Sequence, residues 1–508
     1  MTSSSRESTT QSRGVMVAAF GMVYQQAVSF LSGLIIARVV GAADYGIVSL
    51  ARNIMLAVGI YARLGLDIGL QRFIGEPLHG SIEQRQRLTI LRGFRLLACL
   101  VSVVPFVILA MGLGPWVQQH IYRYEDFSSV LLVTFLALPF LSDVAVLGGA
   151  YRGMLNPAPP ITAEFIIMPT VRLFAIVAMF ALGMRLWAVV IGTSLASTVA
   201  FAYLAVRFKK YRRAQSCPAL SVVEARRQIS VTTKYSIVIA MGMGMTTLTR
   251  STDTFFLGHY AAAKDVGQYS LVQMMLILVG LFGAALGQSL GAQVARCYAE
   301  RNLQGIENLL ANNARQIALV SCPLFAIFFF WGSDLALVFG NSYMVATAVV
   351  RWLALTSLVV TLTASAGFSL SMTGHQWLEL MVLSLGLLFT IVLCRAIIPA
   401  WGQLGAAVAV CTAVVLTNTL RLFVVWRRFS IFHLRGDLLV IGFLPMALAW
   451  CVSQTGGGFG IERIVRAMTG AAVFATLYAV IAWFVLLRDA ERSRLIQIMH
   501  WRRLKPVV

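Results

Sequence analysis

The chain has 508 residues, of which 59% are hydrophobic and only 12% are charged. A soluble domain carries about a quarter charged residues, so this composition excludes an ordinary soluble globular protein. The net charge of +21 suggests nucleic acid as a partner. However, the Lys and Arg residues lie in short stretches between apolar runs, as the positive-inside rule describes for membrane proteins. We therefore expect no nucleic-acid partner.

The apolar residues fall in runs of about 20, the length with which an α-helix crosses the hydrocarbon core of a bilayer. Backbone groups in lipid must be satisfied internally, so such runs are helices. They predict an all-α polytopic membrane protein with about fourteen transmembrane helices. The expected spans are residues 15–40, 46–72, 92–114, 129–151, 160–182, 187–207, 233–257, 267–292, 316–339, 345–372, 377–398, 403–426, 437–454 and 465–487. The short loop at 373–376 and the weak bounds of the thirteenth span leave twelve or thirteen as alternatives.

Basic residues mark one side of the predicted membrane domain. The basic loops are those with Arg85, Arg87 and Arg92, with Lys209, Lys210, Arg212, Arg213, Arg226 and Arg227, with Arg296 and Arg301, and with Arg427, Arg428 and Arg435. The loops on the opposite side are poor in Lys and Arg. This asymmetry predicts cytoplasmic N- and C-termini. We expect residues 1–13 to be a disordered cytosolic tail and residues 489–508 to be a basic one.

An internal repeat appears when the sequence is shifted by 221 residues. The matched identical pairs are Asp44 with Asp265, Gly46 with Gly267, Ser49 with Ser270, Leu50 with Leu271, Val58 with Val279 and Gly59 with Gly280. The repeat predicts two six-helix lobes of the same orientation, 14–207 and 231–428, joined by a basic cytoplasmic linker at 208–230. The last two helices, within 429–488, have no counterpart. Transporters with such parallel repeats bind substrate between the halves.

Charged residues also occur inside the predicted spans, where each costs about 2.5–3.5 kcal/mol on insertion scales. Such residues line a wet cavity or pair with one another. The candidates for substrate binding are Arg52, Arg63, Arg250, Arg172, Arg351 and Gln25, and those for ion coupling or orientation are Asp67, Asp143, Glu164 and Asp253. On a continuous helix, Arg52, Arg63 and Asp67 share one stripe. The alternative is that Arg63–Asp67 and Arg250–Asp253 are structural pairs within a helix.

Cysteines and histidines are dispersed, without a CxxC motif or a His/Cys cluster. The sequence therefore indicates no metal site, and nothing in it is typical of a soluble catalytic site. We expect a protein that is not an enzyme.

Several segments resemble the polysaccharide-transport (Wzx-like) flippases of the multidrug/oligosaccharidyl-lipid/polysaccharide exporter superfamily. They are residues 37–50, 64–73, 253–258, 266–269 and 339–343. The resemblance implies two six-helix lobes around a central cavity, alternating access and no cofactor. It also implies a cargo: an oligosaccharide repeat unit on undecaprenyl diphosphate, moved from the cytoplasmic to the periplasmic leaflet of a bacterial inner membrane. Membrane lipids and a polysaccharide polymerase or export machinery are the implied partners.

A lipid-linked sugar diphosphate requires a polar, partly cationic cavity, and Arg binds phosphate oxygens in two-pronged fashion. Three alternatives stand beside this function. A drug or cation antiporter of the same superfamily favours an acidic cavity, whereas Arg slightly outnumbers the acids here. A peptidoglycan-precursor flippase also has fourteen spans and a cationic interior. A membrane glycan polymerase usually carries a large periplasmic loop, but the longest outer loop expected here is only about 114–128.

Overall fold

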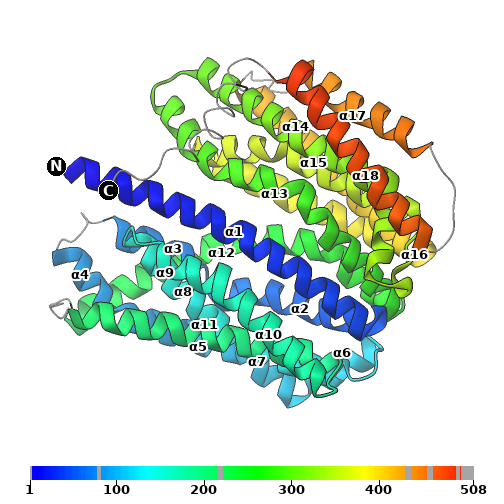
Figure 1. Ribbon diagram of the computed structural model, residues 1–508. Helices are drawn as coiled ribbons and strands as arrows, with labels where there is room; N and C mark the ends of the chain where they lie inside the picture. Colours follow the sequence, from blue (N-terminus) through cyan, green and yellow to red (C-terminus); the bar gives the residue numbers. More distant parts are fainter. Residues whose placement is uncertain are drawn as a thin grey trace, which may run out of the picture. The chain divides into compact units, whose positions relative to one another are not determined.

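The computed structural model describes residues 3–76, 82–214, 221–373, 375–429, 436–454, 461–487 and 492. Nearly all of these residues are helical, and no strand occurs among them (Figure 1). The all-α class predicted from the apolar runs is confirmed.

Contacts divide the chain into two compact units, Met1–Leu271 with Leu383–Ala409, and Val272–Val382 with Val410–Val508. The first unit contains α1 (Ser3–Val40), α2 (Ala42–Ala62), α3 (Leu66–Gly75), α4 (Ile82–Thr89), α5 (Leu91–Ile108), η1 (Leu109–Leu113), α6 (Gly114–His120), α7 (Phe127–Leu136), α8 (Leu138–Gly153), α9 (Ala158–Ile161), η2 (Thr162–Ile167), α10 (Met168–Ala181), α11 (Leu186–Ala214) and α12 (Val222–Tyr260). The second contains α14 (Leu303–Ala336), η3 (Leu337–Phe339), η4 (Asn341–Tyr343), α15 (Thr347–Met372), α17 (Asp437–Ser453), α18 (Ile461–Ile481) and η5 (Ala482–Leu486). Helices α13 (Ala263–Ala299) and α16 (Gln376–Phe429) each contribute to both units.

Eleven of the described helical stretches are long and apolar enough to cross a membrane. The longest, α16, has non-helical backbone at Gly402 and so supplies two spans. Helix α12 and the shorter apolar helix α17 supply two more. The described helices therefore coincide with the fourteen predicted spans, and the chain is a multi-pass membrane protein.

Two expected non-helical segments are partly helical. Helix α1 begins at Ser3, so the described part of the expected tail 1–13 continues the first helix. Helix α11 ends at Ala214 and α12 begins at Val222, so helix extends into both ends of the expected linker 208–230. Residues 215–220, and 489–508 apart from 492, lie outside the described residues. The division into two six-helix lobes stays a prediction.

The second predicted span is not one helix. Helix α2 ends at Ala62, and Leu64 and Gly65 have left-handed backbone before α3 begins. A Cβ at Gly65 would overlap the carbonyl oxygen of Ser236 on α12, so glycine permits this close approach. Because of the break, Arg52 and Asp67 do not lie on one continuous helical stripe, and that part of the sequence interpretation is corrected.

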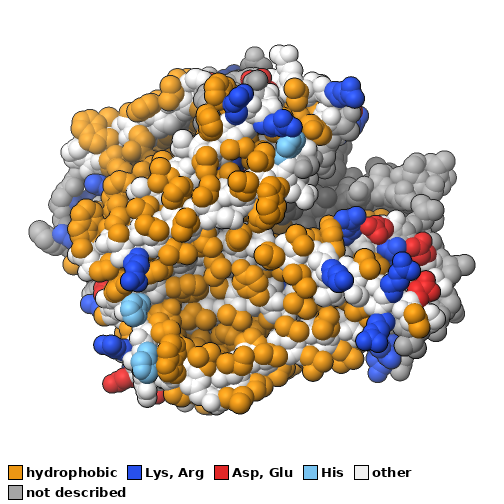
Figure 2. Space-filling view, turned by 180° about the vertical axis from the view of Figure 1, so that it is seen from behind, with side chains coloured by type: hydrophobic (Ala, Val, Ile, Leu, Met, Phe, Trp, Pro, Cys, Tyr) orange, Lys and Arg blue, Asp and Glu red, His pale blue; other side chains and the backbone are white. Residues whose placement is uncertain are grey.

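Hydrophobic side chains cover most of the face seen in Figure 2, with charged side chains at its margins. Large apolar residues such as Leu100, Phe174 and Leu182 are two-thirds exposed or more. In water such a surface would drive aggregation, whereas in a bilayer it is the expected lipid-facing surface.

Candidate functional site

Four charged side chains of the first unit form a cluster toward the predicted cytoplasmic side. Arg63, at the end of α2, lies 3.8 Å from the carboxylate of Asp67 on α3. Glu164 of η2 interacts electrostatically with Arg63, Asp67 and Arg152 of α8. We call these four residues the inner charge cluster. It contains two positive and two negative groups and is therefore balanced.

The inner charge cluster depends on two adjacent glycines of α8. A Cβ at Gly149 would overlap the carbonyl oxygen of Asp67, and one at Gly148 would lie 3.0 Å from the carboxylate of Glu164. The cluster is not fully satisfied, because Nε of Arg63 and Oδ1 of Asp67 are buried without a hydrogen-bond partner.

Asp143 has a tighter and different environment. Arg95 of α5 donates two hydrogen bonds to its carboxylate, at 2.7 and 3.0 Å. Asp143 is only 5% exposed, and two-pronged pairs of this kind are the strong ones. The arrangement fits a structural tie between α5 and α8. Arg95 was not among the predicted site residues, because its only signal in the sequence is a single arginine within an apolar span.

Two arginines of the first unit have no carboxylate partner among the described residues. Arg172 of α10 donates a long hydrogen bond of 3.3 Å to Ser29 Oγ on α1, and its Nε is buried without a partner. Arg52 of α2 is exposed and close enough to repel the Arg172 charge, and both act on the phenol of Tyr45. Within the described residues, neither arginine forms an ion pair with a carboxylate. We call Arg52 and Arg172 the arginine pair.

Gln25 is half-buried on α1, four residues and one helical turn before Ser29. The neighbouring Tyr24 hydroxyl lies 2.9 Å from the hydroxyl of Thr170, two residues before Arg172. Helices α1 and α10 are thus tied together beside the arginine pair. Gln25 is placed to add an amide to the same polar region.

The remaining two candidates of the first unit, Asp253 and Arg250, have different environments. Asp253 of α12 is 1% exposed and accepts hydrogen bonds from Tyr269 Oη at 2.8 Å and from the Thr254 amide at 2.7 Å. Arg250, one turn earlier, is exposed. The carboxylate of Asp253 is thus held by α13 and its own helix, and Arg250 is the more accessible of the two.

Arg351 belongs to the second unit. It is exposed on α15, where its Nε donates to the carbonyl of Phe329 at 3.1 Å and its guanidinium lies over the Phe329 ring. These contacts join α15 to α14 near the ends where the predicted outer loop lies. The structure gives Arg351 a local packing role within the second unit.

Two other membrane-embedded arginines of the second unit are balanced by carboxylates. Arg421 makes a two-pronged pair with Glu379 at 2.8 and 3.1 Å, and Arg315 lies 2.9 Å from Asp437. The sequence analysis missed both pairs, since their partners are distant in the chain. Among the described residues, no group of three or more His, Cys, Asp or Glu side chains could hold a metal ion.

The repeat also has a structural counterpart where α2 meets the start of α13. The hydroxyls of Ser49 and Ser270 lie 2.6 Å apart, and a Cβ at either Gly46 or Gly267 would overlap backbone of the opposite helix. Each of these residues thus meets its own partner in the repeat. Such reciprocal contact is what a local two-fold axis between two helices produces. We call this contact the repeat seam.

Comparison with known proteins identifies the family of the chain. The family model described as "Polysaccharide biosynthesis protein" matches residues 12–290, and the MatE model matches residues 238–395. A probable low-salt glycan biosynthesis flippase, Agl15 of Haloferax volcanii, is 22% identical over 237 residues. That match covers 46% of this chain and 48% of the relative, so the chain spans about half the length of the curated relative that it matches.

Solved structures show the same fold at low sequence identity. The lipid II flippase MurJ, in an inward closed conformation, has a TM-score of 0.70 at 13% identity, covering 91% of this chain and 98% of that one. An inward-facing multidrug resistance transporter of the MATE family has a TM-score of 0.64 at 12% identity, covering 81% and 98%. The family resemblance noted in the sequence is confirmed. The chain belongs to the polysaccharide biosynthesis protein family, within the transporter fold that MurJ and the MATE proteins share.

Proposed function

We propose that this protein is a flippase that moves an oligosaccharide repeat unit, linked to undecaprenyl diphosphate, from the cytoplasmic to the periplasmic leaflet of a bacterial inner membrane. The observation that carries the proposal is the arginine pair. The partly or fully buried Arg63, Arg95, Arg315 and Arg421 each have a carboxylate partner, whereas the partly buried Arg172 and the exposed Arg52 beside it have none among the described residues. Uncompensated charge within a span is costly and marks a substrate path.

The cargo supplies the missing charge in this proposal. A diphosphate or an acidic sugar offers several oxygens, which guanidinium groups bind in two-pronged fashion. The exposed Arg250 and the half-buried Gln25 add donors in the same unit. Outward movement of negative charge from a negative interior is favourable by about 2.3 kcal/mol per charge per 100 mV, so transport does not require ion coupling. Asp67, Glu164 and Asp253 remain candidates for coupling or orientation.

The repeat seam supports alternating access. It closes the gap between α2 and α13 at the ends that the basic loops predict to face outward, where glycines and serines allow backbone contact. Such a contact separates without exposing a large apolar surface. We propose that residues 14–207 and 231–428 are lobes related by an axis along the membrane normal, and that the seam opens when they rock.

Transport of a defined substrate tests the proposal. The protein would be reconstituted into vesicles with an undecaprenyl-diphosphate-linked oligosaccharide, and expressed in a flippase-null strain carrying defined glycan loci. Arg52→Lys and Arg172→Lys should transport partially, because charge is kept while two-pronged contact is lost. Normal transport by Arg52→Ala together with Arg172→Ala would refute the assignment. Rescue of a strain lacking its peptidoglycan-precursor flippase, but not of the glycan strain, would favour the alternative that the MurJ-like fold suggests.

A further inference from the structure

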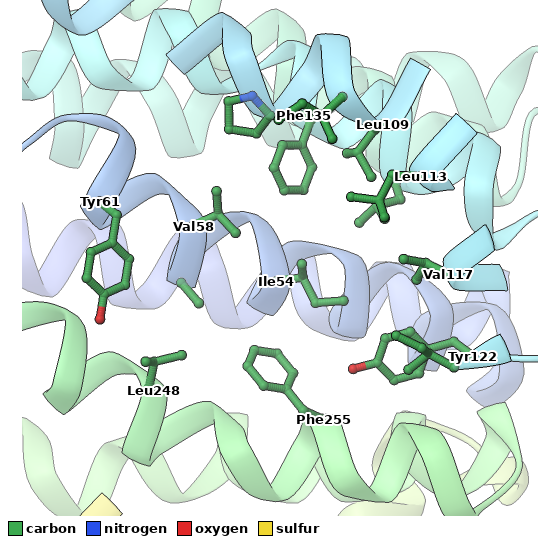
Figure 3. Close-up of a pocket in the computed structure, with 15 residues that line it drawn as sticks. Ile54, Val58, Tyr61, Leu109, Leu113, Val117, Tyr122, Phe135, Leu248 and Phe255 are labelled. Atoms are coloured by element: carbon green, nitrogen blue, oxygen red, sulfur yellow. The ribbon is translucent and has the colours of Figure 1, made fainter. Parts of the chain in front are cut away.

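A second feature of the first unit lies on the other side of the arginine-bearing helices. It is a pocket of about 450 Å³ lined by residues of α2, α5, η1, α6, α7 and α12 and by the loop after α6. Figure 3 shows Tyr61 at one end and Tyr122 at the other, with Ile54, Val58 and Phe255 between them. Apart from the two tyrosine hydroxyls, the lining side chains are hydrocarbon. The pocket reaches the predicted outer loop at Tyr122 and extends along α2 as far as Tyr61.

A local break in the third span borders this pocket. Pro105, the π-helical turn Leu109–Leu113 and Pro115 follow within a few residues, and Gly112 has a φ of 125°. Such elements bend helices and are frequent at functional sites. Pro105, Leu109 and Leu113 themselves line the pocket. The side of the pocket formed by the third span is therefore an irregular helix, although a straight apolar helix would be enough to cross the membrane.

The pocket and the arginines occupy opposite faces of the same two helices. On α2, Ile54 faces the pocket, and Arg52 is separated from it by about 200° around the helix. On α12, Leu248 faces the pocket, and Arg250 is again about 200° away. Gly244 lets these helices touch, since its backbone lies directly against the Tyr61 ring. The two helices form a wall with charge on one face and a hydrocarbon pocket on the other.

We propose that this pocket holds a segment of the polyprenyl chain of the lipid-linked substrate. The inference rests on the proposed function, because it takes the arginine face as the site of the polar head. An occupant within a membrane span must be hydrocarbon, since polar groups would remain unsatisfied there. The volume of about 450 Å³ is many times the roughly 30 Å³ that one water occupies in liquid, so the pocket can hold a segment of hydrocarbon chain. The chain would thus be held beside the helices that bind its head.

A photo-crosslinking experiment tests the occupant directly. A benzophenone amino acid would replace Val58, which lines the pocket. The matched control places it at Leu100, which is 68% exposed on α5, a helix that also contributes to the pocket lining. The purified protein in vesicles of phosphatidylethanolamine and phosphatidylglycerol would receive radiolabelled undecaprenyl diphosphate. We expect labelling at position 58 well above that at position 100, with competition by unlabelled undecaprenyl diphosphate. Equal labelling at both positions, or crosslinks at 58 to phospholipid alone, would overturn the proposal.

Transport kinetics of a variant whose pocket is filled by a larger side chain give the second readout. Val58→Trp should raise the apparent KM for lipid-linked oligosaccharide with kcat little changed, the signature of lost binding shared by ground and transition states. Leu100→Trp should leave both unchanged. If the wild type transports and Val58→Trp is kinetically normal, the pocket assignment fails while the proposed function stands. If the wild type moves no lipid-linked glycan, the proposed function fails, whatever the crosslinks show.

Discussion

Replacing Arg172 by Met should stabilise the protein and abolish transport. An arginine at the centre of a membrane helix costs about 2.5–3.5 kcal/mol on insertion scales. Its hydrogen bond to Ser29 is long, at 3.3 Å, and returns about 1 kcal/mol at most. Met keeps the length of the side chain without its charge, and it also removes the repulsion from Arg52. We therefore expect a net gain of about 1.5–2.5 kcal/mol.

The assay pairs thermal unfolding in detergent with transport in vesicles. Arg95→Met is the matched control, because it removes an arginine that has a partner. It leaves the Asp143 carboxylate buried alone, which should cost about 3–5 kcal/mol. Adding Asp143→Asn should recover most of that loss and restore transport. If Arg172→Met is destabilised like Arg95→Met, Arg172 has a structural role. The lack of a carboxylate partner would then not mark Arg172 as a substrate-binding residue.

Three further outcomes are expected. Cysteines in place of Ser49 and Ser270 should form a disulfide under oxidation, because the hydroxyls lie 2.6 Å apart. The disulfide should stop transport until it is reduced. Unchanged transport with the disulfide intact would refute the proposal that the repeat seam opens during transport. Arg63→Gln combined with Asp67→Asn should transport normally if the pair is only structural and poorly if it binds or orients substrate. A cysteine at the exposed Ala262 should react with membrane-impermeant maleimide in intact spheroplasts, and protection there would reverse the topology.

The fold was largely predictable from the sequence because apolar runs of about 20 residues report membrane helices directly. Even the division of α16 was anticipated, since the expected spans end and begin on either side of the kink at Gly402. The break after Ala62 was missed because apolar residues lie on both sides of Arg63, and Ala42–Gly75 as a whole is apolar enough to resemble one span. Glycine is favoured at position 65 by its left-handed backbone and by the approach of α12 at Ser236, a contact with a residue far away in the chain.

The site was only partly predictable. Charges within spans were recognised by their cost, but their partners depend on tertiary contacts. Asp143 meets Arg95 across 48 residues, and Arg172 meets Ser29 across 143. Spacing along one helix therefore could not separate a balanced pair from an unbalanced one. The repeat singled out Ser49 and Ser270, but it did not predict that their hydroxyls lie within hydrogen-bond distance of each other.

The central claim is that the uncompensated arginine pair receives the anionic head of a lipid-linked glycan. The most direct measurement is transport of an undecaprenyl-diphosphate-linked oligosaccharide in vesicles containing the wild type, Arg52→Met with Arg172→Met, or Arg95→Met with Asp143→Asn. The account predicts transport by the first and third proteins and none by the second, although the second folds at least as stably as the wild type. Transport by the second protein at the wild-type rate would contradict it.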